Sequence, residues 1–82
     1  ALSEYAGVYP LAPGFALTID QADGQLRAQA TGQGAFTLTP SKADVFEAPA
    51  YGIELRFERD ASGAVIALDL HQGGRVTRGE RD

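Results

Sequence analysis

Apolar and polar residues alternate most regularly between Ile53 and Gln72. Every second residue is apolar in IELRF (53–57) and again in IALDL (66–70), a period of two that is typical of strands with one buried face. Between these segments lies the turn Asp60-Ala61-Ser62-Gly63, whose final glycine adopts a left-handed backbone at no cost. The pattern predicts one long β-hairpin.

The turn length and the apolar pattern together predict which residues of this hairpin lie opposite each other. A four-residue turn gives the pairs Arg59 with Ala64, Phe57 with Ile66, Leu55 with Leu68, and Ile53 with Leu70. All large apolar side chains then share one face, whereas a slip of one residue would set apolar against polar side chains. The same pairing places Glu54 opposite Asp69, a like-charge contact that Arg56 would relieve diagonally.

The rest of the chain repeats the alternation in shorter segments separated by glycine and proline. The predicted strands are Gly7–Tyr9, Phe15–Asp20, Gln25–Ala30, a strand carrying Phe36 and Leu38, Val45–Ala48 with Phe46 pointing inward, and Arg75–Gly79. The first strand is expected to end at Pro10, because proline cannot donate to a ladder, and residues 40–44 are expected to form a loop. One helical turn, residues 2–6 with Ser3 as its N-cap, is predicted before the first strand.

Two turns predict the pairing of the N-terminal strands. A four-residue turn at 21–24 pairs Ile19 with Leu26, Leu17 with Ala28, and Phe15 with Ala30. A five-residue connection then pairs Phe36 with Ala30 and Leu38 with Ala28. Large side chains face small ones across the pairs that involve Ala28 and Ala30, which suits a tightly curved wall.

The last turn, at Gly73-Gly74, leaves two alternatives. A two-residue turn places Val76 beside His71, whereas a three-residue loop places Val76 beside Leu70 and aims Arg78 at the core. In both cases the final strand has few apolar residues, so we expect it to be short or to lie at an edge.

Eight strands in succession, with no segment of helical period, predict an all-β fold. Short loops between consecutive strands favour a small antiparallel up-and-down meander that closes into a barrel. The interior of an eight-stranded barrel is just wide enough to be filled by side chains or to hold one small ligand. The bulk of the predicted interior residues favours a filled barrel; they are Tyr9, Phe15, Leu17, Ile19, Leu26, Phe36, Leu38, Phe46, Ile53, Leu55, Phe57, Ile66, Leu68 and Leu70.

Length, charge and composition restrict the functional classes. At 82 residues without an initiating Met, we expect residues 1–82 to be a single domain excised from a larger protein. The net charge of −4 is spread along the chain, and its one basic cluster, Arg75, Arg78 and Arg81, is diluted by acids, which argues against nucleic acid as a partner. No apolar run approaches the roughly 20 residues of a membrane-spanning helix.

The residues that could carry chemistry do not form a catalytic set. Ser62 and His71, the only histidine, lie at opposite ends of the predicted hairpin, and no Ser-x-x-Lys motif is present. With one histidine and no cysteine, we expect no metal site and no cofactor. Tyr5, Tyr9 and Tyr51 are expected to be core or rim residues with a polar handle; with His71 they are the candidate rim residues.

Several short motifs resemble those of one known family. Tyr5-Ala6-Gly7-Val8-Tyr9 is similar to its Y-x-G-x-Y opening. Its later landmarks are similar to Gly24-Gln25-Leu26, Leu38-Thr39-Pro40, residues 57–63, and Leu70-His71-Gln72-Gly73-Gly74 with Arg81. The chain thus resembles the uncharacterised lipocalin-like domain found at the C-terminus of bacterial β-lactamase-related serine hydrolases and penicillin-binding-protein-like peptidases.

This resemblance implies a small β-barrel that accompanies a catalytic domain without supplying its nucleophile. It implies a bacterial and often periplasmic or secreted setting, and it brings no established catalytic residues to this chain. The leading hypothesis is a non-enzymatic accessory domain whose partner is a hydrolase domain of the same chain or a second copy of itself. The alternative is a binding module that holds a small apolar or peptide ligand at the barrel mouth.

Overall fold

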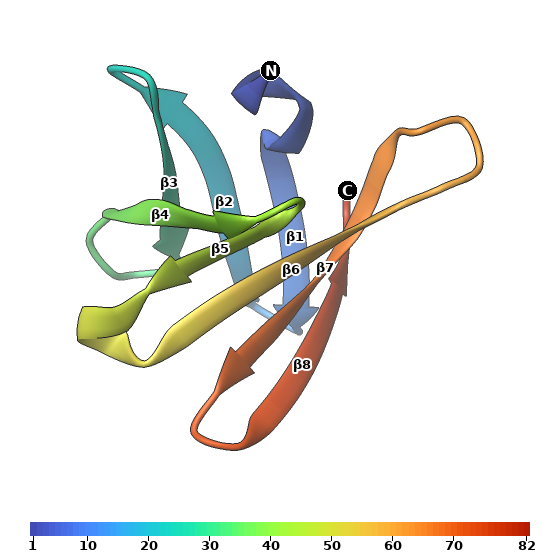
Figure 1. Ribbon diagram of the computed structural model, residues 1–82. Coiled ribbons are helices and arrows are strands. Elements are labelled where there is room, and N and C mark those ends of the chain that lie inside the picture. Colours follow the sequence, from blue (N-terminus) through green and yellow to red (C-terminus); the bar gives the residue numbers. More distant parts are fainter.

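The structure is a computed structural model that describes all 82 residues. Each strand pairs with the next along the chain, and the sheet curls into a nearly closed barrel (Figure 1). The elements are η1 (Leu2–Tyr5), β1 (Gly7–Ala12), β2 (Phe15–Ala22), β3 (Gln25–Ala30), β4 (Phe36–Lys42), β5 (Val45–Ala48), η2 (Pro49–Tyr51), β6 (Ile53–Arg59), β7 (Val65–Gln72) and β8 (Arg75–Glu80). The predicted all-β, antiparallel up-and-down architecture is confirmed.

The barrel closes between its edge strands, β1 and β8, without a hydrogen-bonded ladder. The Asp82 N–H donates to the Val8 carbonyl at 2.8 Å, and the two strands come together at the buried Gly79. A Cβ at Gly79 would lie 2.8 Å from the carbonyl oxygen of Pro10 and 3.3 Å from the Cβ of Tyr9. A residue without a side chain is therefore needed where the barrel closes.

The register of the β6–β7 hairpin differs from the prediction by two residues. Phe57 lies opposite Leu68 and Leu55 opposite Leu70, each partner being two positions further along β7 than expected. Because side chains alternate with a period of two, this shift keeps the same faces together, and apolar residues still meet. The apolar pattern therefore identified the buried face correctly but not the pairing.

Two local features cause the shift. Arg59 faces Val65, so five residues rather than four connect the strands, and the Asp60 N–H donates to the Ala64 carbonyl (2.9 Å) across this longer turn. A β-bulge beside Arg59 then adds Ile66 as one extra residue on β7. A bulge reverses the alternation beyond it, so Val65 joins the buried core while the predicted interior residue Ile66 lies outside it.

The corrected register also changes the charge pairing on the outer face. Glu54 lies opposite His71, and Arg56 lies opposite Asp69. The expected like-charge contact between Glu54 and Asp69 is therefore absent. Arg56 nevertheless donates through Nε to Glu54 on its own strand, and Asp69 lies 3.8 Å from Nη1 of Arg78 on β8.

The β2–β3 register is also shifted by two residues. The turn consists of Asp23 and Gly24 alone, with φ of 55° and 76°, as in the type I′ turns that favour two-residue hairpins. Leu17 consequently lies opposite Ala30, the last residue of β3. Phe15 has no partner on β3 and is 37% exposed. The prediction that it lies in the interior was therefore wrong.

The third shift lies between β3 and β4. Leu38 lies opposite Leu26 and Phe36 opposite Ala28, in place of the predicted Ala28 and Ala30. Residues 29–35 have no partner on β4, so the wall opens between the two strands. Phe36 is half-buried as a result.

Both proline predictions were wrong. β1 continues through Pro10 and β4 through Pro40, and the ladder is irregular immediately after each proline. A bulge interrupts the ladder locally, so it is a position where the missing N–H of proline is tolerated. The predicted N-cap, Ser3, lies inside η1 and makes no capping bond.

The last turn adopts the two-residue alternative. Val76 lies opposite His71 and Gln72 opposite Arg75. Arg78 accordingly points outward, where its Nη1 donates to Oε1 of Glu58 at 2.5 Å.

Fourteen buried residues form one core inside the barrel: Tyr5, Tyr9, Leu17, Ile19, Leu26, Ala28, Ala30, Leu38, Phe46, Ala48, Leu55, Phe57, Val65 and Leu68. The predicted interior residues Phe36, Ile53 and Leu70 pack against it while remaining partly exposed. These three lie on the half of the barrel away from η1. The barrel is therefore filled at one end only.

Candidate functional site

The end of the barrel beneath η1 is sealed by four aromatic rings. Tyr5 of η1 packs against Phe46 and Phe57, with ring centroids 5.1 and 4.7 Å apart. Tyr9 lies edge-on to Phe57 at 5.8 Å and donates its hydroxyl hydrogen to the Tyr5 carbonyl at 2.7 Å. Edge-to-face packing at these distances is favourable. Each tyrosine buries its ring and satisfies its hydroxyl, so this end is closed.

A polar cluster holds η1 over these rings. The Tyr5 hydroxyl donates to Oδ1 of Asp44 at 2.7 Å. Arg59 donates through Nε to the same carboxylate at 3.0 Å and through Nη1 to Oε1 of Glu4 at 2.6 Å. The Arg59 guanidinium, followed by the Tyr5 hydroxyl, lowers the pKa of Asp44 below its ordinary value. Burial, followed by the bond to Asp44, raises the pKa of Tyr5.

The opposite end of the barrel opens into an apolar pocket of about 350 Å³, which we call the mouth. Eight of its eleven lining residues are apolar; all eleven are Phe15, Leu17, Ala30, Gln33, Gly34, Ala35, Phe36, Tyr51, Ile53, Leu70 and Gln72. They come from β2, β3, the β3–β4 loop, β4, η2, β6 and β7. The register shifts place Phe15, Ala30 and Phe36 at this end.

Tyr51 stands at the edge of the mouth because of the short 3₁₀ turn η2. Pro49 begins this turn, and Gly52 ends it with a left-handed φ of 66°, a conformation that glycine adopts without strain. The Tyr51 ring lies 4.8 Å from the Phe36 ring, and Tyr51 remains 56% exposed. An aromatic pair thus forms one rim of the mouth.

A second hollow of about 280 Å³, the seam hollow, lies where β1 and β8 separate. It is lined by Leu11, Ala12, Phe15, Leu70, Gln72, Arg75 and Thr77. Phe15, Leu70 and Gln72 also line the mouth, so the two hollows are neighbours. Together they make the open end of the barrel the most apolar concave surface of the molecule.

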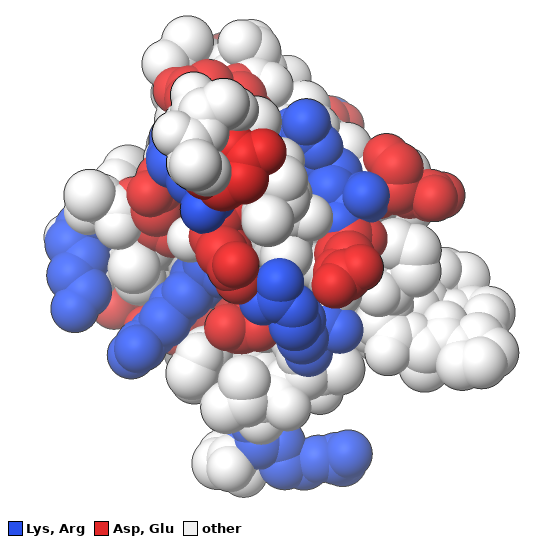
Figure 2. Space-filling model, turned by 90° about the vertical axis from the view of Figure 1, so that its right-hand side faces the viewer, with Lys and Arg blue, Asp and Glu red and all other residues white.

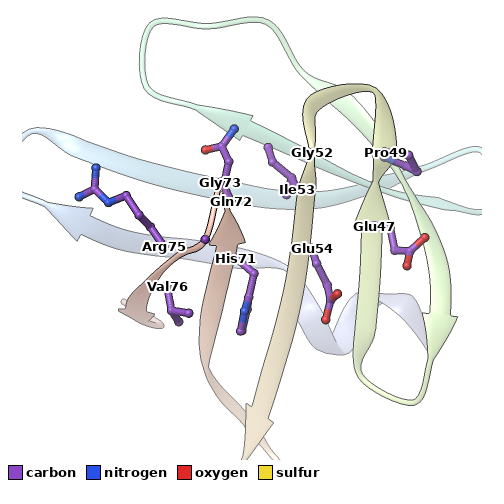
Figure 3. Close-up of a pocket in the computed structure, with 11 residues that line it drawn as sticks. Glu47, Pro49, Gly52, Ile53, Glu54, His71, Gln72, Gly73, Arg75 and Val76 are labelled. Carbon is purple, nitrogen blue, oxygen red and sulfur yellow. The ribbon is translucent and has the colours of Figure 1, made fainter.

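His71 lies elsewhere, in a polar groove of about 480 Å³ on the outside of β6 and β7 (Figure 3). Glu47, Glu54 and His71 lie side by side on consecutive strands of this wall. The bond from Arg56, above all, lowers the pKa of Glu54. No group of three or more acidic, histidine or cysteine side chains converges closely enough to hold a metal ion.

The structure separates the four candidate rim residues. Tyr5 and Tyr9 are core residues at the sealed end, only Tyr51 lies at the mouth, and His71 faces the outer groove. Sequence reasoning assigned Phe15, Phe36 and Leu70 to a filled interior, although they line the mouth. For Phe15, the signal that could have identified it is the Asp23-Gly24 pair, whose two-residue turn leaves Phe15 without a partner on β3.

Ser62, the hydroxyl considered for nucleophilic chemistry, is part of its turn. Its hydroxyl donates to Oδ1 of Asp60 at 2.7 Å, and its N–H donates to the same oxygen at 2.9 Å. These bonds, with that from Ala64, lower the pKa of Asp60. His71 lies near the opposite end of β7, away from this turn. The two side chains are therefore not brought together.

Many charges on the outer surface are paired. Figure 2 shows acidic and basic side chains interleaved on one face, and the ion pairs include Arg78 with Glu58 and Arg27 with Asp20. This face offers no concentrated basic surface of the kind that attracts nucleic acid. None of the helical segments has the length and apolarity required to span a bilayer.

Comparison with known proteins identifies a family for this chain. The family profile described as Domain of unknown function (DUF3471) matches residues 1–81. No match was found among curated proteins or among solved structures. Because the profile spans nearly the whole chain, the chain belongs to the DUF3471 family, a domain of unknown function.

Proposed function

We propose that this chain is a non-catalytic accessory domain of a bacterial serine hydrolase related to β-lactamases. It packs on the catalytic domain of the same protein or on a second copy of itself, and it helps to shape access to the active site. The motif resemblance described above supports the association with hydrolases. The structural observation that carries the proposal is the open apolar mouth.

The mouth has the properties of a contact surface. Tyr51 and Phe15 leave 56% and 37% of their surfaces exposed beside the partly buried Phe36. Apolar surface in water is unfavourable by roughly 25 cal/mol per Å², and contiguous exposed apolar patches often mark interaction sites. Aromatic side chains are also enriched in interfaces, where they bury a large area at a small entropic cost.

Catalysis belongs to the neighbouring domain in this proposal. The Ser62 hydroxyl supports its own turn through Asp60, and His71 faces the outer groove beside Glu54. A nucleophile needs a base within hydrogen-bond reach, and these two residues lie on different parts of the hairpin. The domain would therefore affect hydrolysis by position, not by chemistry.

The experiment compares substitutions at the mouth and on the outer wall of the full-length parent protein. Tyr51→Asp and Phe15→Asp place a charge at the mouth, whereas Thr18→Asp places the same charge on an exposed outer position of β2. Hydrolysis rate and oligomeric state by light scattering are the readouts, and the melting temperature of the 82-residue domain controls for unfolding. We expect the two mouth variants, but not Thr18→Asp, to change hydrolysis or assembly. If all three variants have the same hydrolysis rate and oligomeric state as the wild type, the proposal is contradicted.

A second candidate function is the binding of a small ligand at the mouth. The observation that favours it is a pocket of about 350 Å³ with mostly apolar walls, which is within the usual range of small-molecule sites. A panel of small apolar compounds and short peptides tests this function through the melting temperature. An unchanged melting temperature across the panel would remove it.

A further inference from the structure

Arg75 is the one arginine in this chain without a polar partner. Each of the other five donates to a carboxylate or a carbonyl oxygen: Arg27 to Asp20, Arg56 to Glu54, Arg59 to Asp44, Arg78 to Glu58, and Arg81 to the Glu4 carbonyl. The Arg75 side chain is exposed, and its guanidinium makes no hydrogen bond or ion pair with the rest of the chain. In Figure 3 its side chain extends away from Glu54 and Glu47. A free guanidinium thus stands where the seam hollow at the open end of the barrel adjoins the outer groove, since Arg75 lines both.

Its position is defined by the corrected register. The two-residue turn after Gln72 sets Arg75 opposite Gln72, and both line the seam hollow together with Phe15 and Leu70. Phe15, Leu70 and Gln72 also line the mouth. An apolar surface therefore runs from the mouth to a single unpaired positive charge.

We propose that the open end binds an unbranched hydrocarbon chain that ends in a carboxylate. The chain lies in the mouth and across Phe15 and Leu70, and the carboxylate meets the guanidinium of Arg75. A guanidinium presents parallel N–H donors that match the two oxygens of a carboxylate. This inference rests on the ligand-binding function proposed above and specifies its chemical class.

The lining of the mouth favours a hydrocarbon chain over a peptide. Every amide of a bound peptide would need hydrogen-bond partners, because an unpaired polar group is costly to bury. The only polar side chains that the mouth offers for this purpose are those of Gln33 and Gln72, together with the Tyr51 hydroxyl. A hydrocarbon chain requires none of them, and its one charged group finds Arg75.

The test is a titration of the ¹⁵N-labelled domain with octanoate, followed by nuclear magnetic resonance. We expect amide shifts in residues that line the mouth and the seam hollow. Arg75→Gln should weaken octanoate binding about three- to fivefold, as expected for a partly exposed ion pair. Lys42→Gln removes the same charge from an exposed position at the end of β4, and it should leave the affinity unchanged.

Two further probes test the charged contact and the apolar contact separately. Octanol has the same chain without the charge, and its affinity should be equal for the wild type and Arg75→Gln. Ala35→Trp adds a large ring at an exposed position of the mouth lining, and it should weaken binding of both ligands.

Three results would each contradict a different part of the proposal. If octanoate binds the wild type and Arg75→Gln equally, the carboxylate assignment is wrong, although binding at the mouth stands. If an acetylated trileucine with a free carboxylate binds more tightly than octanoate, the hydrocarbon assignment is wrong. If neither octanoate nor octanol shifts the mouth residues, the ligand-binding function fails, while the accessory-domain proposal keeps its own test in the full-length protein.

Discussion

The rings of Phe36 and Tyr51 lie 4.8 Å apart at the open end of the barrel, with an angle of 43° between their planes. Phe36 belongs to β4, and Tyr51 belongs to the turn that precedes β6. The pair therefore connects β4 with η2. It does so beside the opening in the wall, where residues 29–35 have no partner on β4. It forms a rim, because Tyr51 is mostly exposed.

This pair predicts a small effect on stability. Tyr51→Ala should lower the free energy of unfolding by about 0.5 to 1.5 kcal/mol, the usual contribution of an aromatic pair. Tyr51→Phe keeps the ring and should leave stability unchanged, because the Tyr51 hydroxyl makes no hydrogen bond within the chain. Urea denaturation measures both. A loss above about 3 kcal/mol for Tyr51→Ala would be typical of a core residue and would contradict its assignment to the rim.

Tyr9 provides the opposite case. Its side chain is fully buried, and its hydroxyl donates to the Tyr5 carbonyl at 2.7 Å. Tyr9→Phe should therefore lower the free energy of unfolding by about 1 to 2 kcal/mol, since it leaves a carbonyl oxygen without its donor. The same hydroxyl deletion at Tyr51 is the control. Equal effects at the two positions would show that the sealed and open ends do not differ as described.

Gly79 predicts the cost of opening the seam. Gly79→Ala places a Cβ 2.8 Å from the Pro10 carbonyl oxygen, so β1 and β8 must separate, and overpacking of this kind costs about 1 to 3 kcal/mol. Gly34→Ala is the control, because nothing lies within 4 Å of its Cβ position and its φ is not left-handed. Thermal unfolding of both variants tests this. A Gly79→Ala protein as stable as the wild type would place the closure of the barrel elsewhere.

Asp44 predicts a dependence of stability on pH. The Arg59 guanidinium and the Tyr5 hydroxyl hold the pKa of Asp44 below its ordinary value of 3.8. A carboxyl whose pKa is lowered by folding stabilises the protein above its unfolded value, and this contribution is lost as pH falls through the folded value. Asp44→Asn should thus be less stable than the wild type at pH 7, and the difference should shrink below about pH 4. The left-handed φ of 61° at this position also suits asparagine.

Urea denaturation at pH 7 and pH 3 provides the comparison. Other carboxyl groups titrate in both proteins and largely cancel in the difference. A difference that stays constant between the two pH values would mean that the charge of Asp44 contributes nothing to holding η1.

The apolar pattern predicted the strands and their buried faces, but not how the strands pair. A period of two is unchanged by a shift of two residues, so the pattern could not distinguish Leu68 from Leu70 as the partner of Leu55. The choice depends on the five-residue turn at Asp60 and on the bulge at Ile66, which local hydrogen bonds and packing determine. The two-residue turn at Asp23-Gly24 was readable from sequence, because this dipeptide favours type I′ geometry.

The candidate site was less predictable for the same reason. Tyr51 was a candidate rim residue because tyrosine combines an apolar ring with a polar hydroxyl, but Tyr5 and Tyr9 were candidates on the same ground. Phe15 and Phe36 were assigned to the interior, since their exposure follows from pairings that the pattern leaves open. Arg75 has no distinguishing local motif, and its isolation is visible only when the partners of the other arginines are known.

We propose that the open apolar end of the barrel carries the interactions of this domain. Amide hydrogen exchange tests it most directly, by comparison of the isolated domain with the same residues in the full-length parent protein. We expect added protection in segments 31–36, 49–53 and 70–77, which contain residues that line the mouth and the seam hollow, and unchanged exchange around Asp44 and Arg59. Unchanged exchange at the mouth, with new protection at the sealed end, would contradict it.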